Sequence, residues 1–351
     1  MDSGPALVDL PLPALLARLE SLGHPAFRAR QLFRQLHHRR ARSLDAMTEL
    51  PAALRQDLAS IPLAALAVRD VRTSSDGTEK LLLETRDGRP VETVLIPMEG
   101  GTATQCLSSQ SGCAMGCAFC LTGRMGHVRN LTPGEIVDQH YLGLARGGRP
   151  IRNLVFMGMG EPLQNFENVR DAVGILEHEL GAALSPRRIT ISTCGVLPGI
   201  RRMAAGEIPA LLAISLNAPS DEIRSRIMPI NRRYPLADLL DELKRYPLPP
   251  RLRHTFEYVL LRGVNDSVEH ARELVRLLSH LRCKVNLIVF NESPGVPFQS
   301  PEPDAVEAFR GLLERKHFTV TVRQSRGRDI LAACGQLAAA HAPPATGGGD
   351  S

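Results

Sequence analysis

The sequence predicts an α/β protein built on a partial (β/α)6 barrel, with a helical accessory domain before it and a small β-linker between the two. Three observations support this class. Strand-like and helix-like segments alternate from residue 103 onward, apolar residues up to residue 62 recur at helical spacing, and short strands with Asp-Gly turns lie between. A flat doubly wound sheet is the alternative for the alternating part. The predicted boundaries are 1–62, 63–102, 103–337 and, for a disordered tail, 338–351.

The first segment is expected to form helices, with Pro25 and Pro51 placed to open new ones. Its apolar residues at helical spacing are Leu15, Leu16, Leu19, Leu22, Phe27, Leu32, Phe33 and Leu36. The same stretch carries many basic residues, namely Arg28, Arg30, Arg34, His37, His38, Arg39, Arg40 and Arg42. This pattern fits a module that grips a phosphate backbone, and a solvated helix face is the other interpretation.

The linker is predicted to be a small antiparallel sheet. Its strands are Leu66–Val71, Lys80–Glu84 and Val91–Ile96, and the hairpin turns are Asp76-Gly77 and Asp87-Gly88.

The barrel segment supplies six candidate strands before a last one at Phe318–Arg323. The six are Thr104–Ser108, Asn153–Met157, Arg188–Thr193, Leu211–Leu216, His254–Leu261 and Lys284–Phe290. The best-marked helix opens at Thr132-Pro133-Gly134-Glu135, which is a capping box with proline at the first helical position. Further helices are expected at Glu167–Glu179, Leu236–Tyr246, Val268–Leu281 and Pro303–Lys316.

The composition is that of an ordinary globular protein. Apolar residues make up 43% and charged residues 23% of the 351 residues, and no apolar stretch has the length of about 18 residues that a membrane span needs. The N-terminus lacks a basic signal region, so we expect a cytoplasmic protein without a membrane partner. A net charge of +5 fits either a nucleic-acid partner or a solvated basic surface. The absence of Trp argues against a broad stacking platform for single strands.

The central motif is Cys113-x3-Cys117-x2-Cys120, which follows the first barrel strand. Three thiolates this close can hold three irons of a [4Fe-4S] cluster and leave the fourth iron open to a small chelating molecule. Gly112 and Gly116 would let the backbone fold tightly around it. A structural zinc site is the alternative, but it needs a second ligand pair that the sequence does not offer.

These residues and several further short motifs resemble the RlmN/Cfr family of radical S-adenosylmethionine (SAM) RNA methyltransferases. The resemblance runs from the N-terminal helices to about residue 337, with the motifs in order. The motifs are Thr104-Gln105-Cys106-Leu107-Ser108-Ser109-Gln110, Gly158-Met159-Gly160-Glu161-Pro162, Ile191-Ser192-Thr193, Ile214-Ser215-Leu216 and Ala333-Cys334-Gly335-Gln336-Leu337.

The resemblance implies a [4Fe-4S] cluster and SAM, with two SAM molecules used per turnover. It implies that SAM contacts Gly160, Glu161, Ser192, Ser215, Leu216, Asn217 and Asn291. Read alone, Gly158-x-Gly160 is a weak fingerprint for dinucleotide binding, since the third glycine is missing. Asn217 departs from the histidine that the family often has, although an amide still donates and accepts hydrogen bonds.

The resemblance also implies a covalent route to an unreactive carbon. Carbon 2 of adenine is electron-poor and cannot attack a methyl sulfonium, so Cys334 would carry the methyl group and Cys106 would resolve the adduct through a disulfide. Glu92 matches a family position with a proton-acceptor role. Cys194 and Cys283 are taken as structural. The expected partners are 23S rRNA, tRNA beside the anticodon, and an electron donor such as flavodoxin or ferredoxin.

Three alternatives remain at this point. A Cfr-like enzyme that methylates carbon 8 shares the cluster and both working cysteines, so the motifs separate the two activities poorly. A non-catalytic iron–sulfur RNA-binding protein belongs to another class, but it would need neither Cys106 nor Cys334. A glycyl-radical activase would likewise not need Cys334.

Overall fold

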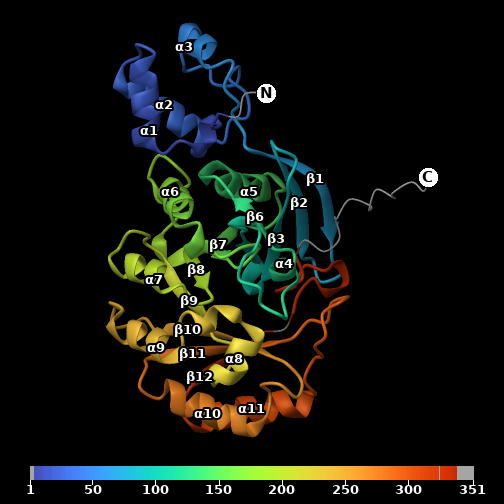
Figure 1. Cartoon of the computed structure of the whole chain (residues 1–351). Helices are drawn as coiled ribbons and strands as arrows, with labels where there is room; N and C mark the ends of the chain where they lie inside the picture. Colours follow the sequence, from blue (N-terminus) through green and yellow to red (C-terminus); the bar gives the residue numbers. More distant parts are fainter. Residues whose placement is uncertain (1–3, 324, 338–351) are drawn as a thin grey trace, which may run out of the picture.

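The computed structural model describes residues 4–323 and 325–337. Its centre is one curved sheet of ten strands in the order β1-β2-β3-β4-β7-β8-β9-β10-β11-β12 (Figure 1). The strands β1 and β12 are its two edges, so the barrel is open, as the sequence predicts. The tail from residue 338, expected to be disordered, lies outside the described residues.

The N-terminal helices form a separate layer on top of the barrel helices (Figure 1). They are α1 (Leu12–Ser21), α2 (Ala26–His37) and α3 (Ala52–Asp57), after the short η1 (Leu7–Asp9). Pro25 and Pro51 are the N-cap residues of α2 and α3, so each does open a helix. Asp138 of α5 (Pro133–Ala145) joins the layers, because its buried carboxylate accepts hydrogen bonds from Arg42 Nη1 (2.6 Å) and the backbone N–H of Ala65 (2.7 Å).

The predicted linker strands are part of the main sheet and do not form a sheet of their own. They are β1 (Leu66–Thr73), β2 (Glu79–Thr85) and β3 (Pro90–Met98), paired antiparallel with one another, and β3 pairs antiparallel with β4 (Thr102–Cys106). Their register matters for the site. Lys80 lies opposite Val94, Val94 opposite Cys106, and Cys106 opposite Val155 of β7. Paired residues share a face, so these four side chains form one row across four strands.

From β4 onward all neighbouring strands are parallel. The strands after β4 are β7 (Ile151–Phe156), β8 (Ile189–Thr193), β9 (Leu211–Ser215), β10 (His254–Leu260), β11 (Cys283–Val289) and β12 (Thr319–Arg323). The helices are α5, α6 (Phe166–Glu177), α7 (Leu197–Ala204), α8 (Asp221–Ile227), α9 (Leu236–Arg245), α10 (Val268–Leu278) and α11 (Pro303–Arg315). The predicted capping box of α5 is present, with Thr132 and Glu135 each capping the other's backbone N–H.

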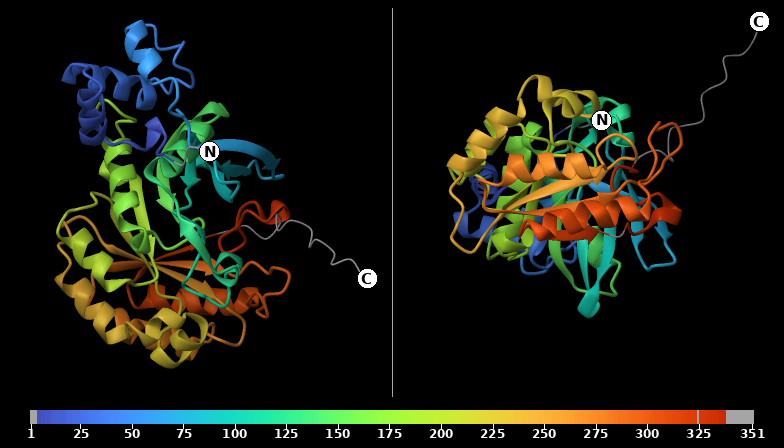
Figure 2. Two further views of the ribbon diagram at one scale, coloured as in Figure 1. Left: turned by 45° about the horizontal axis from the view of Figure 1, so that its top comes forward. Right: turned by 90° about the horizontal axis from the view of Figure 1, so that it is seen from below.

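Some elements were not predicted from the sequence. A short hairpin of β5 (Gln110–Gly112) and β6 (His127–Asn130) flanks α4 (Leu121–Arg124) and carries the segment with the three clustered cysteines. The chain after β12 folds back along the inner side of the sheet, near β1 and β2 (Figure 2). Among the described residues, no helix has the length and apolar character needed to cross a membrane.

Candidate active site

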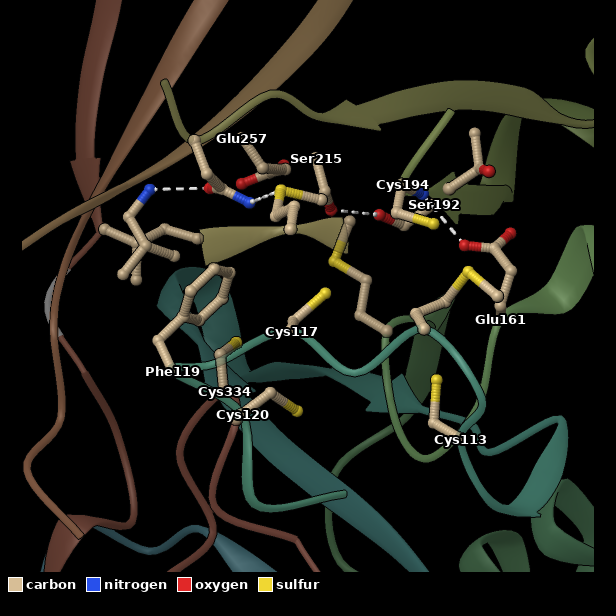
Figure 3. Close-up of a pocket in the computed structure, with 18 of the residues that line it drawn as sticks. Cys113, Cys117, Phe119, Cys120, Glu161, Ser192, Cys194, Ser215, Glu257 and Cys334 are labelled. Atoms are coloured by element: carbon tan, nitrogen blue, oxygen red, sulfur yellow. Dashed lines mark hydrogen bonds between the residues drawn. The ribbon is translucent and has the colours of Figure 1, made fainter. Parts of the chain in front are cut away.

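A cavity opens where the carboxyl ends of the parallel strands meet the cysteine-bearing loop (Figure 3). Its volume is about 950 Å³, which includes the solvent-open mouth. Cys113, Cys117 and Cys120 lie on one side of it, and Glu161, Ser192 and Ser215 on the other. The carboxyl ends of barrel strands are where such folds build their active sites.

The loop that carries the three cysteines is held by backbone contacts. The N–H of Cys113 donates to Gly126 O (2.8 Å), and the N–H of Ala118 donates to Ile227 O (2.9 Å). Gly112 has φ +74°, and a Cβ there would lie 2.0 Å from Gly126 O, so only glycine fits this approach. The predicted role of Gly112 in a tight loop is therefore confirmed.

The three thiols suit a cluster better than a single ion. Among the described residues, no three His, Cys, Asp or Glu side chains are grouped closely enough to hold one metal ion. A tetrahedral zinc site needs all its ligands around one point, at about 2.3 Å for sulfur. A cubane makes no such demand, because each thiolate binds a different iron. The chemistry of the donor set fits the [4Fe-4S] cluster, with Cys113, Cys117 and Cys120 as its holders.

Gly160 and Glu161 follow β7 and lie in the cavity wall. Gly160 has φ +101°, and a Cβ would meet the Gln110 nitrogen at 2.7 Å, so the close approach of the two backbones requires glycine. The Glu161 carboxylate accepts hydrogen bonds from the N–H groups of Cys194 (2.8 Å) and Leu163 (3.1 Å). Burial raises the pKa of Glu161, and the bonds from Cys194 oppose that rise.

Ser192 at the end of β8 and Ser215 at the end of β9 also line the cavity, with their hydroxyl oxygens 3.4 Å apart. Asn217 lines it too, at φ +60°. Its side chain is already engaged, since Oδ1 accepts from the Val259 N–H (2.8 Å) and Nδ2 donates to the Met228 sulfur (3.3 Å). Leu216 is fully buried and is not part of the cavity wall. The predicted contact between Leu216 and SAM stays a prediction, because Leu216 does not line this cavity.

The buried Asn291 Oδ1 in this wall lacks a hydrogen-bond partner within the described protein, and the nearby Glu257 Oε2 has only a long ion pair with Arg323 Nη1 (3.9 Å). Buried polar groups are almost always paired, so an unpaired oxygen in a cavity wall indicates a bound molecule with hydroxyl or N–H donors. SAM carries ribose hydroxyls, an amine and an adenine amino group, which are such donors. The residues present therefore fit SAM. Glu257 was missed from the sequence because its strand, β10, carries no recognisable motif.

A second cavity of about 820 Å³, open to solvent, adjoins the first. Cys106 at the end of β4 lies in its wall, together with Arg323 and the exposed residue Cys334. Cys334 also lines the first cavity, as do Met157 and Asn291. The two predicted working cysteines thus share one cavity, and one of them also faces the clustered thiols. Cys194, taken as structural, lies in the wall of the first cavity, whereas Cys283 is buried within β11.

Both cysteines of the second cavity are free thiols with raised pKa values. Burial raises the pKa of Cys106 to about 12, helped by the nearby Cys334, and Arg323 opposes the rise. Desolvation also raises the pKa of Cys334, since its thiol is enclosed although the residue as a whole is exposed, and Arg323 again lowers it. Both thiols are therefore protonated at neutral pH, and Arg323 is the cation placed to stabilise a thiolate.

Glu92 is fully buried on β3 and lies outside the walls of both cavities. Its carboxylate forms an ion pair with Lys80 of β2 (3.1 Å), and their side chains are only 1% and 2% exposed. The proton-acceptor role stays a prediction.

Arg224 of α8 is a site residue that sequence reasoning missed. It is fully buried and donates to Cys194 O (2.7 Å), Leu216 O (3.0 Å) and Asn231 Oδ1 (2.9 Å). It therefore fixes the chain just after β8 and just after β9, where Ser192 and Ser215 end their strands.

Comparison with known proteins matches both parts of the chain. Residues 107–278 match the model of the radical SAM superfamily, and residues 6–63 match the N-terminal domain of ribosomal RNA large subunit methyltransferases. A dual-specificity RNA methyltransferase RlmN from Anaeromyxobacter dehalogenans is 50% identical, with 97% of this chain and 94% of the relative covered. The chain belongs to the RlmN family. A second RlmN relative, from Nitratidesulfovibrio vulgaris (strain Miyazaki F), is 51% identical over 91% of the chain and 90% of its own length.

A solved structure has nearly the same architecture. The radical SAM methyltransferase from Sphaerobacter thermophilus has a TM-score of 0.90 and 46% identity, covering 95% of this chain and 99% of that one. As a member of the RlmN family, the chain is a radical SAM enzyme that methylates RNA, and the family implies an iron–sulfur cluster and SAM. The alternatives of a non-catalytic RNA-binding protein and a glycyl-radical activase do not survive this assignment.

Proposed function

We propose that the enzyme methylates carbon 2 of adenine in 23S rRNA and in tRNA next to the anticodon, through a methyl group carried on Cys334. The observation that carries this proposal is the place of Cys334 in the walls of both cavities. In the first cavity its sulfur can receive a methyl group, and in the second it can present that group to a base. Two SAM molecules are used per turnover, one as methyl donor and one as radical source.

The cluster and SAM, when bound, supply a carbon radical strong enough to remove a hydrogen atom from a methyl group. The residues of this chain determine where that radical acts. Cys113, Cys117 and Cys120 hold the cluster, while the wall with Ser192, Ser215 and Asn291 orients SAM toward Cys334. Apolar side chains in the wall, among them Phe156, Ile288 and Phe290, limit the access of water to the reacting atoms.

Cys106 completes the reaction in this proposal. The adduct gives up its unpaired electron to the iron–sulfur centre, and Cys106, as a thiolate, takes the proton from the ring carbon. Cys106 Sγ then attacks Cys334 Sγ, and the bond between Cys334 Sγ and the transferred carbon breaks. That carbon keeps the electron pair and receives the proton that Cys106 had taken, so the methylated base leaves as the disulfide forms. Arg323, which lines the same cavity, favours the thiolate that this attack requires. Glu92 is a second candidate for the proton acceptor.

The N-terminal helices are proposed to hold the RNA. Arg30 and Arg34 of α2, with Arg39 and Arg40 after it, are exposed and can reach a phosphate backbone. His37 does not belong to this face, because it is buried against Tyr141, and burial lowers its pKa to about 3. The electron donor is proposed to be a flavodoxin or ferredoxin of the cytoplasm.

The test uses reconstituted holoenzyme, a 23S rRNA fragment and tRNA, with nucleoside mass spectrometry of the products. We expect 2-methyladenosine in both RNAs, and none from the Cys334→Ala variant with its iron content unchanged. If 8-methyladenosine forms instead, the carbon-8 activity replaces the proposal. If Cys334→Ala still methylates RNA, the covalent scheme is wrong.

A further inference from the structure

The segment that carries Cys334 is tied to the turn between β1 and β2, far away in the sequence. Figures 1 and 2 show the two side by side. The Asp329 carboxylate accepts hydrogen bonds from Ser74 Oγ (2.6 Å) and from the N–H of Ser75 (3.1 Å). In the opposite direction, the Gly327 N–H donates to Asp76 Oδ2 (2.9 Å). Two carboxylates, one from each segment, thus cross-link the turn and the C-terminal segment.

The turn itself is rigid. The Ser74 N–H donates to Thr78 O (2.8 Å), the Gly77 N–H donates to Ser74 O (2.9 Å), and the Thr78 N–H donates to Asp76 Oδ1 (2.8 Å). Asp76 therefore uses one carboxylate oxygen inside the turn and the other on the C-terminal segment. A turn that satisfies its own backbone in this way can hold a neighbouring segment without being deformed.

A buried ion pair makes a second attachment, closer to the cysteine. Lys80 Nζ donates to Leu331 O (3.1 Å) while it pairs with Glu92 (3.1 Å). Lys80 stands in the same cross-strand row as Val94 and Cys106. The residues that pack on this row include Ile330, Ala332 and Leu337 of the C-terminal segment. A buried ammonium is costly without partners, so Lys80 and Glu92 at this position indicate a constraint beyond packing.

The segment held in this way is strained. Leu331 has φ +53°, a left-handed conformation that side chains with a Cβ rarely adopt. Gly327 has φ +67°, and a Cβ there would lie 2.8 Å from Ala332 Cβ and 3.0 Å from Thr78 Cγ2. Strain of this kind persists only when surrounding contacts fix it, and it gathers where a functional group must be placed.

We propose that the β1–β2 turn (Ser74–Thr78) together with the Lys80–Glu92 pair is a latch that positions Cys334 relative to Cys106. Lys80 is the central positioning residue, and Glu92 is its counter-ion. The purpose of the latch rests on the proposed function of Cys334. The hydrogen bonds and the ion pair that form the latch are independent of that function. A freely moving segment would give the two sulfurs many relative positions, whereas the latch keeps Cys334 in the cavity that Cys106 also lines.

Two latch variants test this inference without depending on RNA methylation. Asp329→Ala removes one of the two carboxylate cross-links and leaves the Gly327–Asp76 hydrogen bond, and Asp329→Asn keeps one acceptor oxygen as a conservative rescue. Lys80→Met combined with Glu92→Gln removes the buried attachment and leaves no uncompensated charge. Asp241→Ala is the matched control, because Asp241 is also an exposed aspartate with one surface partner, Lys244 at 2.8 Å.

Two measurements report on position. Hydrogen exchange of the peptide around residues 327–337 measures opening of the segment. Equilibration of the holoenzyme with glutathione redox buffers measures the effective concentration of Cys334 toward Cys106 as their disulfide forms, with glutathione as oxidant. We expect both latch variants to exchange faster and to lower that effective concentration about tenfold, as loss of bonds to charged groups implies. Asp329→Asn should recover part of the loss, and Asp241→Ala should match the unmodified enzyme.

The outcomes separate the possibilities. Unchanged exchange and unchanged disulfide equilibrium in both variants would overturn the latch. If Lys80→Met/Glu92→Gln loses RNA methylation while both readouts stay unchanged, Glu92 is the proton acceptor and the latch is wrong. If the double variant fails to fold, Asp329→Ala still decides, since its changed side chain is exposed. RNA methylation by Cys334→Ala would defeat the proposed function, while the exchange and disulfide results would still judge the latch.

Discussion

Replacing Arg224 with Met should loosen the SAM-facing wall of the main cavity. The Arg224 guanidinium is fully buried and makes its three shortest hydrogen bonds to Cys194 O, Leu216 O and Asn231 Oδ1, with a longer fourth one to Ser215 O (3.3 Å). The first two follow β8 and β9, the strands that bring Ser192 and Ser215 into the cavity. Met fills much of the same volume but donates no hydrogen bond. The three acceptors would therefore be left buried without their donor.

The magnitude follows from opposing terms. A hydrogen bond to a charged group contributes about 1.5–3 kcal/mol, so three together contribute about 4.5–9 kcal/mol. The cation is costly to bury, and its lowered pKa shows that burial acts against the charged form. Removing a buried charge returns several kcal/mol. We therefore expect a net loss of about 3 kcal/mol in the free energy of unfolding.

Urea unfolding measures this loss, and equilibrium dialysis of SAM with the holoenzyme measures the effect on the site. We expect the SAM dissociation constant to rise about tenfold, which corresponds to about 1.4 kcal/mol. Arg272→Met is the control, because Arg272 pairs with Glu269 on the exposed side of α10 and such pairs contribute about 0–1 kcal/mol. A loss below about 1 kcal/mol in Arg224→Met with unchanged SAM binding would refute the reasoning.

Three further predictions concern the glycine turn, the resolving cysteine and a buried histidine. Gly160→Ala should weaken SAM binding at least about tenfold with iron content unchanged, because its Cβ would meet the Gln110 nitrogen at 2.7 Å; equal dialysis curves would contradict this. Cys106→Ala should leave RNA covalently attached to Cys334, seen as a shifted band of labelled RNA on a denaturing gel, and released methylated RNA would count against it. Acidification should destabilise the fold through His37. Burial lowers the pKa of His37 from 6.5 to about 3, so between these pH values the unfolded chain binds a proton that the folded chain does not. At pH 5 the loss is about 2 kcal/mol, measured by urea unfolding at pH 7.5 and pH 5, and it should shrink in His37→Gln.

Sequence patterns located the elements whose signals are local. The capping box at Thr132 is one example, because its residues are three apart and need only each other. The hairpin turns at Gly77 and Gly88 are another, and both glycines have positive φ. The loop with the three cysteines was recognised in the same way, since three cysteines within eight residues form a candidate ligand set, and its binding of a cluster stays a prediction.

Long-range features lay beyond such reasoning. Nothing near Arg224 in the sequence shows that its partners follow β8 and β9. An arginine on a short charged helix such as α8, which also carries Arg226, would ordinarily be expected at the surface. His37 was counted with the basic residues around it, and only the packing of α2 on α5 shows that it is buried against Tyr141. The linker strands were predicted correctly as strands. That they extend one edge of the main sheet depends on the pairing of β3 with β4, and the sequence pattern does not reveal that pairing.

The placement of Cys334 indicates what the antiparallel strands β1–β3 contribute to this barrel. A cysteine at the end of a barrel strand would face one fixed point, whereas Cys334 lies in a segment anchored on both sides. Before it, Lys80 holds Leu331 O; after it, the Leu121 N–H beside the cluster loop donates to Gly335 O (2.8 Å). One anchor comes from the antiparallel strands and the other from the cluster loop. The thiol between these anchors lies in the walls of both cavities, as the proposed role of methyl carrier requires, and in that proposal β1–β3 help to position it.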